Sequence, residues 1–319
     1  MHERHIETMQ VGTLSMRVAI QGQGPLVLLC HGFPESWYSW RHQLDALSAA
    51  GYRAVAPDMR GYGGTDAPSD VQAYTMLHLV GDMVELVRTL GETSAVIVGH
   101  DWGAPVAWNA AMLRPDLFRG VVGMSVPFSP RGSEDPLSAL ERQGITTFYT
   151  QYFQTAGVAE KELEADPDAT IRRVTYSMSG DGPDRVVAGL VAPGTGLLDN
   201  TTLPETMPNW VDPEEIAYIA GEFARTGFTG GLNWYRNMRR SWELMAPWHG
   251  CVIKQPSMFV AGAQDDVLKF PGAKARIANL TQVLPGLRGC HILDGAGHWI
   301  QRERSKEVSD LLIHFLNSL

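Results

Sequence analysis

The sequence has few cysteines, no long apolar run and no apolar leader. Three cysteines occur in 319 residues, Cys30, Cys251 and Cys290, and their odd number and irregular spacing predict reduced thiols rather than a disulfide framework. No stretch approaches the roughly 18 apolar residues that a membrane span needs, and the N-terminal stretch MHERHIETMQ lacks the apolar segment of a signal peptide. These absences predict a cytoplasmic protein that does not enter a membrane.

Positive charge is also scarce. The chain has 26 Lys and Arg against 35 Asp and Glu, a net charge of −9, and no basic stripe, so nucleic acid is not an expected partner. Hydrophobic residues make up 44% of the chain, which is ample for a packed core. The composition therefore predicts a folded protein whose partners are small molecules, and it leaves the choice between a monomer and a homodimer open.

Short apolar runs alternate with helical patterns, which predicts a mainly parallel sheet flanked by helices. The predicted strands cover residues 26–30, 53–58, 95–100, 120–126, 257–262 and 290–295. Apolar residues recur at helical spacing over 76–87 and again over 308–316. Residues 131–246 break this rhythm and are rich in helical patterns. We therefore predict a core made of 1–130 and 247–319, with 131–246 inserted as a helical cap.

The sequence Gly99-His100-Asp101-Trp102-Gly103 follows one of these strands and precedes a helical pattern. A strand, a tight turn with small residues around one exposed side chain, and a helix form a nucleophile elbow, in which serine is usual at the tip. Here Asp101 takes that position, at the carboxyl end of a strand, where open α/β sheets bind their ligands. Taken alone, Asp101 is equally consistent with a simple helix N-cap.

Two further polar residues follow later strands. Asp265 comes after the strand at 257–262 and His298 after the strand at 290–295, so nucleophile, acid and base occur in the order of an α/β-hydrolase triad. The sequence His-Gly-Phe-Pro at 31–34, here named the HGFP loop, follows the first parallel strand. In this fold that loop and the residue after the nucleophile each supply one backbone N–H to an oxyanion hole. The sequence thus predicts the amides of Phe33 and Trp102 as donors, the alternative being a tight turn set by Pro34 alone.

Five segments together resemble the epoxide hydrolases of the α/β-hydrolase fold, of the soluble and microsomal type. They are HGFPESWYSWRHQ, PDMRGYGGTDAP, VGHDWGAPVAWN, GFTGGLNWYRN and GAGHWIQRE. The resemblance extends over essentially the whole chain and is weakest between residues 155 and 205. It implies an eight-stranded, mostly parallel sheet with an inserted helical cap, conversion of an epoxide and water to a vicinal diol, and no metal or organic cofactor.

The resemblance also implies two cap tyrosines that polarise the epoxide oxygen. The segment FYTQYFQTAG at 148–157 gives Tyr149, with Tyr152 as the alternative, and GGLNWYRN at 230–237 gives Tyr235. Substrate-binding residues are expected among the catalytic set and its aromatic neighbours. The candidates are Phe33, Trp37, Trp102, Tyr149, Tyr235 and Trp299, with Phe128, Met178 and Met238 as further pocket residues that are as consistent with simple core positions.

An aspartate suits an epoxide because the reacting carbon is saturated. A serine would leave an ether that water does not readily cleave, whereas an aspartate leaves an ester that a second nucleophile can resolve. A carboxylate is ionised at neutral pH, so His298 is expected to activate water in the second step, with Asp265 holding its ring. Two alternatives remain at this point: a haloalkane or haloacetate dehalogenase with the same nucleophile, against which Phe33 and the tyrosines count, and a catalytically silent ligand-binding receptor.

Overall fold

The computed structural model describes residues 3–183 and 189–319 and contains an eight-stranded sheet in the order β1-β2-β4-β3-β5-β6-β7-β8. The strands are β1 (His5–Val11), β2 (Leu14–Gln21), β3 (Leu26–Cys30), β4 (Arg53–Pro57), β5 (Ala95–His100), β6 (Phe118–Met124), β7 (Ser257–Gly262) and β8 (Leu287–Leu293). The pairs β1–β2 and β2–β4 are antiparallel, and every other neighbouring pair is parallel. The predicted α/β-hydrolase fold is confirmed.

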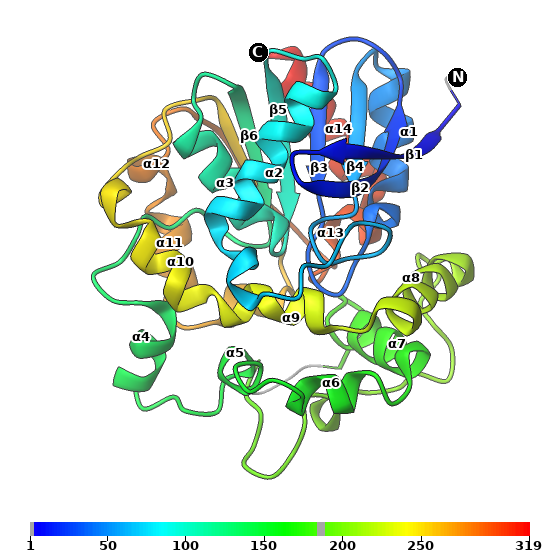
Figure 1. Cartoon of the computed structure of the whole chain (residues 1–319), viewed down its shortest axis with the longest axis vertical. Coiled ribbons are helices and arrows are strands. Elements are labelled where there is room, and N and C mark those ends of the chain that lie inside the picture. The colour runs from blue at the N-terminus through cyan, green and yellow to red at the C-terminus, as the bar shows by residue number, and fades with distance from the viewer. Residues whose placement is uncertain (1–2, 184–188) are drawn as a thin grey trace.

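Helices cover both faces of this sheet, which explains why its central strands are continuous apolar runs. The core helices are α1 (Arg41–Ala49), α2 (Met76–Thr89), α3 (Gly103–Leu113), α11 (Ala273–Ala278), α12 (Leu280–Val283), α13 (Ile300–Glu303) and α14 (Ser305–Asn317). One face packs against α2 and α3, and the other packs against α1 and α14 (Figure 1). All residues of β3, β5 and β7 are buried, so the sheet is a rigid platform for the loops at its carboxyl edge.

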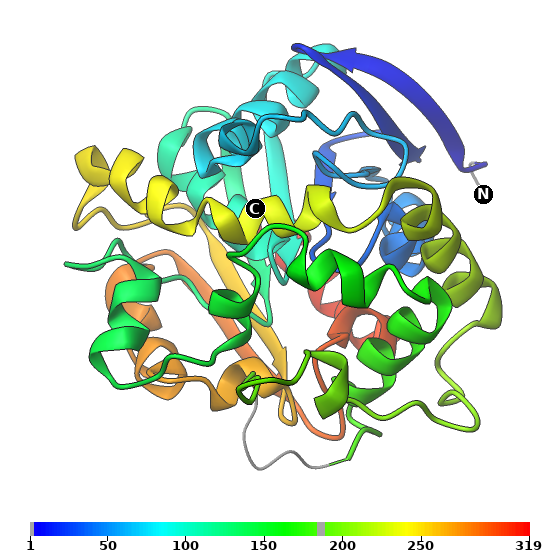
Figure 2. The ribbon, with the colours of Figure 1, turned by 60° about the horizontal axis from the view of Figure 1, so that its bottom comes forward.

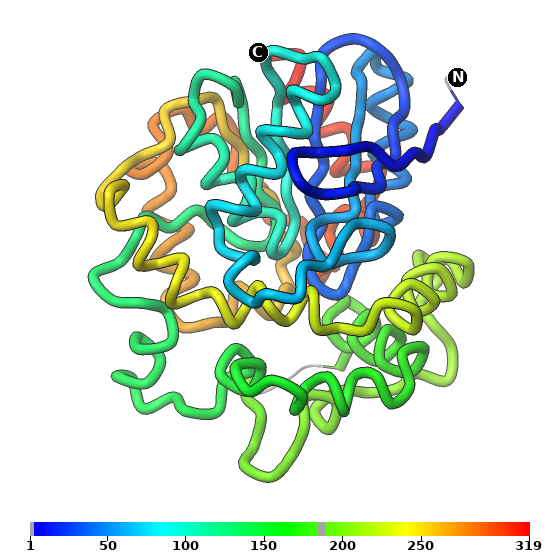
Figure 3. Tube along the Cα trace, viewed as in Figure 1, coloured from blue at the N-terminus to red at the C-terminus, as the bar shows by residue number. Residues whose placement is uncertain are grey.

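A set of helices stands between β6 and β7 in the sequence, and we refer to it as the cap. Its helices are α4 (Pro136–Arg142), α5 (Tyr149–Tyr152), α6 (Val158–Leu163), α7 (Pro167–Ser177), α8 (Pro213–Thr226), α9 (Thr229–Arg236) and α10 (Met238–Leu244). Figure 1 shows α5 to α8 below the sheet, and Figure 2 shows α9 running between them and the core. The tube in Figure 3 follows the chain out of the core after β6 and back along α10. The carboxyl edge of the sheet therefore faces the cap.

Buried ion pairs join the cap to the core. Glu215 on α8 is completely buried and pairs with Arg41, at 2.8 Å, and with Arg302, at 2.7 Å. On the same helix, Glu222 pairs with Arg17 of β2 at 3.0 Å. Because buried charges are stable only when they are paired, these contacts fix the position of α8 on the core.

The strand predictions are confirmed with small shifts, and the three cysteines are free thiols. The strands at 26–30, 95–100 and 257–262 have the predicted bounds, whereas β4 is one residue shorter and β6 and β8 begin and end a few residues earlier. The antiparallel β1 and β2 at the edge of the sheet were not among the predicted strands. Within the described ranges, no helix is long and apolar enough to cross a membrane.

Candidate active site

Asp101 stands at the tip of a sharp turn between β5 and α3, with a positive φ of 50°. The neighbouring glycines permit this turn, since a Cβ on Gly99 would collide with the carbonyl group of Gly103 and one on Gly103 with that of Cys30. A non-glycine residue in this conformation carries strain that proteins retain mainly at functional sites. The side chain of Asp101 does not cap α3, whose N-cap is Trp102, so the simple capping interpretation is wrong.

The HGFP loop lies directly against the carboxylate of Asp101. The backbone N–H of Phe33 donates a hydrogen bond of 2.8 Å to Oδ1 of Asp101, and the Phe33–Pro34 peptide bond is cis. A Cβ on Gly32 would collide with the same carboxylate, so only glycine permits this close approach. One of the two predicted backbone donors therefore contacts the carboxylate, and the other belongs to Trp102, the next residue in the chain.

His298 links the two acidic residues. Its Nε2 lies 3.6 Å from Oδ2 of Asp101 and has no hydrogen-bond partner among the described residues, while its Nδ1 lies 3.1 Å from Oδ1 of Asp265. Asp265 is held in turn by the backbone N–H of Val267, at 3.0 Å. Burial alone would lower the pKa of His298, but the carboxylates of Asp265 and Asp101 outweigh it and raise that pKa well above its ordinary value. Burial alone would raise the pKa of Asp265, but the charge and the hydrogen bond of His298 outweigh this effect and lower that pKa.

Ser125 is a further residue of this group, and the sequence patterns did not reveal it. It follows β6, is completely buried and has a positive φ of 67°. Its Oγ lies 3.0 Å from Nδ1 of His298, and its hydroxyl also contributes to the lowered pKa of Asp265. Ser125 thus contacts both members of the acid–base pair.

A second buried network lies behind the histidine. Nδ1 of His100 lies 2.8 Å from Oε2 of Glu35, and its Nε2 lies 2.7 Å from the carbonyl oxygen of His298. Gln301 donates a hydrogen bond of 2.9 Å to the other oxygen of Glu35. Burial opposes ionisation of Glu35, but His100 and the guanidinium of Arg302 lower its pKa to about 2. Glu35 therefore remains charged and ties the HGFP loop, through its bond from the Gly32 amide at 3.2 Å, to the loop of His298.

Two cap tyrosines line the same pocket as Asp101. Tyr149 begins α5 and Tyr235 lies on α9, and their ring centroids are 5.8 Å apart at an interplanar angle of 77°. The ring of Tyr235 also contacts Trp102 edge to face, with centroids 5.1 Å apart. Burial, reinforced by the charge of Asp101, raises the pKa of both phenols, so both are protonated donors at neutral pH. Tyr152 instead donates a hydrogen bond of 2.8 Å to Glu162 within the cap.

A pocket of about 80 Å³ lies between Asp101 and the two tyrosines. Its other lining residues are Phe33, Pro34, Phe153, Leu163, Thr170, Val174, Met178, Gly189, Leu197, Phe228, Asp266, Val267 and Phe270. Apolar side chains predominate, which favours binding of an uncharged substrate and excludes bulk water. Among the described residues, no group of three His, Cys, Asp or Glu side chains is arranged to hold a metal ion.

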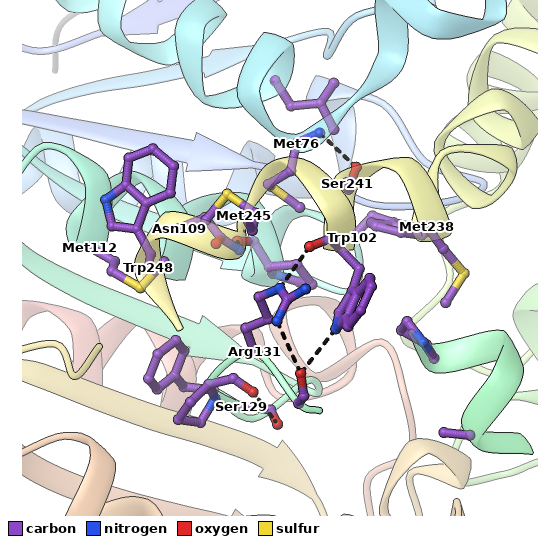
Figure 4. A pocket seen from close by; sticks show the side chains of 18 of the residues that line it. Met76, Trp102, Asn109, Met112, Ser129, Arg131, Met238, Ser241, Met245 and Trp248 are labelled. Carbon is purple, nitrogen blue, oxygen red and sulfur yellow. Dashed lines mark hydrogen bonds between the residues drawn. The ribbon is translucent and has the colours of Figure 1, made fainter. Parts of the chain in front are cut away.

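Not every predicted substrate-binding residue lines this pocket. The indole N–H of Trp37 donates to the hydroxyl of Tyr218 at 2.8 Å, and the ring packs in the core beside α1. The indole N–H of Trp299 donates to the carbonyl oxygen of Thr175 at 2.8 Å. Neither ring therefore lines the pocket at Asp101. Trp102 and the further candidates Phe128 and Met238 line a second, larger cavity of about 510 Å³ (Figure 4).

The cap is bonded directly to the loop that carries His298. The backbone N–H of His298 donates to the carbonyl oxygen of Met178 at 2.8 Å. Oε2 of Glu303 accepts hydrogen bonds from the amides of Gly180, at 2.8 Å, and Gly297, at 2.9 Å. The side chain of Glu303 thus links Gly180 of the cap to Gly297, the residue that precedes His298.

Comparisons with known proteins agree with this geometry. Residues 25–305 match the family described as the alpha/beta hydrolase fold. Epoxide hydrolase A of Mycobacterium tuberculosis is 44% identical over 99% of this chain and 98% of its own length, and an epoxide hydrolase of Caballeronia sordidicola is 42% identical over 96% and 92%.

Solved structures give the same result. An epoxide hydrolase from an endophytic Streptomyces superposes with a TM-score of 0.93 at 44% identity, covering 99% of this chain and 95% of that one. Epoxide hydrolase A of Mycobacterium thermoresistibile also gives a TM-score of 0.93 at 44% identity, covering 99% and 98%. Neither the dehalogenase nor the silent receptor is favoured by these relatives. The chain therefore belongs to the epoxide hydrolases of the α/β-hydrolase fold.

Proposed function

We propose that this protein converts an epoxide and water to a vicinal diol through a covalent ester on Asp101. One observation carries the proposal: the pocket is bounded by a strained carboxylate on one side and by two protonated phenols, Tyr149 and Tyr235, on the other. An epoxide requires both, because a nucleophile must reach its carbon while an acid supports its oxygen. The proposed nucleophile Asp101 thus comes from the elbow, and the two proposed acids come from the cap helices α5 and α9.

In the first step, an Oδ atom of Asp101 attacks a ring carbon and the C–O bond on the far side breaks. The electron pair moves to the ring oxygen, which accepts hydrogen bonds from the phenols of Tyr149 and Tyr235 and then a proton from one of them, leaving that tyrosine as a phenolate. The raised pKa of each phenol keeps its proton in place until a stronger base, the opening oxygen, forms beside it. The product of this step is an alkyl ester of Asp101.

In the second step, Nε2 of His298 takes a proton from water, and the water oxygen attacks the carbonyl carbon of the ester. The negative charge that develops on the Asp101 oxygen is stabilised by the Phe33 N–H, which already donates to that carboxylate, and by the amide of Trp102. Esterification also removes the charge of Asp101, one of the two charges that raise the pKa of His298. The imidazole therefore accepts a proton more readily in the ester than in the free enzyme, with Asp265 holding its other nitrogen. The tetrahedral intermediate then breaks the bond between the former ester carbon and the alkyl oxygen, which takes the proton from His298 and leaves as a hydroxyl of the diol. The carboxylic acid of Asp101 that is formed loses its proton, and a proton returns to the tyrosine that was deprotonated in the first step.

The roles of the other parts follow from the same proposal. We assign residues 1–130 and 247–319 to the catalytic core and 131–246 to the cap that supplies the tyrosines. The substrate is a small epoxide, and the reaction uses water without a metal or organic cofactor. The excess of acidic residues and the free cysteines support a cytoplasmic enzyme that does not bind nucleic acid.

The experiment that tests the covalent step is a single turnover in ¹⁸O-labelled water with enzyme in excess over styrene oxide. The diol is expected to be unlabelled, since its new oxygen comes from the Asp101 carboxylate, and the label is expected in the enzyme. With substrate in excess, later turnovers serve as the control and deliver the label to the diol. Label in the diol during the first turnover would show that water attacks the epoxide directly.

A second experiment tests the role of the base. His298→Gln should still form the ester and fail to hydrolyse it, so intact-protein mass spectrometry should show enzyme with the added mass of the epoxide. Asp101→Asn treated in the same way is the control and should show no adduct. If His298→Gln remained unmodified, the histidine would be needed before ester formation and its assignment as the water-activating base would be wrong.

A further inference from the structure

Glu162 lies on the short cap helix α6 and takes no part in the proposed reaction, yet its carboxylate accepts three hydrogen bonds. Its Oε2 accepts from the hydroxyl of Tyr152, at 2.8 Å, and from the backbone N–H of Leu197, at 3.0 Å. Its Oε1 accepts from the backbone N–H of Leu198, at 2.8 Å. Hydrogen bonds to an ionised acceptor are stronger than those between neutral groups, so this carboxylate holds two consecutive amides of the chain in place.

The two amides belong to a part of the chain that bounds the active-site pocket, and we refer to residues 196–198 as the wall segment. Leu197 lines the pocket that contains Asp101, and so does Leu163, the residue that follows Glu162 on α6. Figure 1 shows α6 next to α5, the helix that begins at Tyr149. Glu162 is therefore adjacent in sequence to one wall residue and bonded to another.

The attachment of the wall segment depends on this carboxylate. Among the described residues, Glu162 is the only group from outside 190–201 that forms a hydrogen bond with residues 192–200. Attachment to the rest of the cap resumes at Thr201, whose carbonyl oxygen accepts from the guanidinium of Arg173 at 3.1 Å. Loss of the carboxylate would thus free the wall segment from its hydrogen-bonded support.

The wall segment is matched to the carboxylate by its sequence. A Cβ on Gly196 would collide with the carboxylate of Glu162, so glycine is required where the two approach each other. The amides of Leu197 and Leu198 stand at the start of the helical turn Leu198–Asn200, where N–H groups have no partner within the turn. The carboxylate satisfies both amides at once.

Two further carboxylates close to Glu162 attach α6 to another part of the pocket wall. Glu160 pairs with Arg236 of α9 at 2.7 Å, and Glu164 accepts a hydrogen bond of 2.9 Å from the backbone N–H of Phe228, which lines the pocket. The region of α6 therefore fixes the pocket wall at two places, and Glu162 is its attachment to the wall segment.

We propose that Glu162 is a positioning residue that determines the size of epoxide accepted, because it holds Leu197 in the wall of the pocket. The pocket has a volume of only about 80 Å³, so release of one leucine side chain changes its capacity substantially. The inference rests on the proposed epoxide hydrolysis and names the part of its site that limits the substrate. Glu162 contacts none of the reacting groups, so its removal should alter substrate binding far more than the chemical steps.

The experiment compares a small and a large epoxide, styrene oxide and trans-stilbene oxide, on the whole enzyme. In Glu162→Ala, KM for styrene oxide should rise about tenfold, the loss of affinity expected when contact with part of a leucine side chain is lost. Because this contact stabilises substrate and transition state alike, kcat should change by no more than about twofold. The preference for styrene oxide over stilbene oxide, as the ratio of kcat/KM values, should fall about tenfold.

Three further variants test the contact itself. Gly196→Ala keeps the carboxylate but displaces it, so it should lower the preference in the same direction and provides a second route if Glu162→Ala does not fold. Glu162→Gln keeps the shape and one acceptor oxygen and should recover part of the preference. Lys161→Ala is the matched control, since Lys161 is exposed on the same helix, and it should leave KM, kcat and the preference unchanged.

Binding of neutral amides separates this inference from the reaction. A primary amide fits the site without reacting, because its oxygen can accept from Tyr149 and Tyr235 while its N–H donates to Asp101. Calorimetry should show that the preference for phenylacetamide over diphenylacetamide also falls about tenfold in Glu162→Ala. The same fall in amide preference, with no diol formed from either epoxide, would overturn the proposed reaction and support the role of Glu162. An unchanged preference in both Glu162→Ala and Gly196→Ala, or an equal change in Lys161→Ala, would overturn that role.

Discussion

Replacing Ser125 by alanine tests whether the pair His298–Asp265 acts in the second chemical step. The hydroxyl of Ser125 lies 3.0 Å from Nδ1 of His298, and the same nitrogen lies 3.1 Å from Asp265. The alanine variant removes one oxygen atom from a completely buried position and leaves the carboxylate in place. Its effect should therefore appear in the orientation and basicity of the imidazole and not in the nucleophile.

The expected magnitude follows from the hydrogen bond that is lost. A hydrogen bond to a charged group contributes about 1.5–3 kcal/mol, and the lower end applies here because Asp265 still accepts from the same N–H. About 1.4 kcal/mol corresponds to a tenfold change in rate. Hydrolysis of the ester should thus slow about tenfold, whereas formation of the ester, which does not use the base, should change by no more than about twofold.

Stopped-flow measurement of tryptophan fluorescence separates the two steps, because Trp102 lies beside the nucleophile. Excess styrene oxide gives the rate of ester formation from the fast phase and the rate of hydrolysis from the steady state. Ser39→Ala is the matched control, since Ser39 is equally buried and its hydroxyl has no hydrogen-bond partner in the described part of the chain. An unchanged hydrolysis rate in Ser125→Ala, or equal slowing of both steps, would refute the reasoning.

Three other predictions concern the tyrosines, the pH dependence of stability and the attachment of the cap. Tyr235→Phe should slow ester formation by about 10²- to 10³-fold, as expected for loss of one donor to a developing oxyanion. Tyr152→Phe is the control and should not slow this step, because the hydroxyl of Tyr152 is bonded to Glu162. Stopped-flow kinetics measure ester formation in both variants. Because the pKa of His298 is raised in the folded protein, its contribution to stability is full below pH about 6.5 and is lost as the pH rises through the folded pKa. His298→Gln should therefore reduce the loss of unfolding free energy at alkaline pH, measured in urea at several pH values. Glu215→Gln leaves two buried arginines without their carboxylate and should lower the free energy of unfolding by about 3–5 kcal/mol; a loss below about 1 kcal/mol, as for a surface pair, would contradict this.

The central strands and the triad were predictable because both have local signals. Strands buried on two faces are continuous apolar runs, and residues that follow the carboxyl ends of parallel strands must meet at one edge of the sheet. Asp101, Asp265 and His298 were identified in that way, and the structure brings them together. The edge strands β1 and β2 have no such signal. β1, HIETMQV, is mostly polar and largely exposed, and the pairing of β1 with β2 and of β2 with β4 gives these strands their conformation.

The supporting residues were beyond prediction for a different reason. Ser125 and Glu35 are single polar residues without a pattern, and they contact the histidines only because the chain brings β6 and the HGFP loop to the same edge of the sheet. Trp37 and Trp299 show the converse. Both are close in sequence to predicted site residues, but proximity along the chain does not determine the direction of a side chain, and both indole N–H groups donate to residues of the cap, Tyr218 and Thr175.

The hydrogen bonds between the cap and the His298 loop couple the position of His298 to that of the cap. The amide of His298 is bonded to the carbonyl oxygen of Met178, and Glu303 is bonded to Gly180 and Gly297. A cap that swung open as a hinged lid would break these bonds and displace the base that the second step requires. The contacts that attach the cap therefore also set the position of the proposed base.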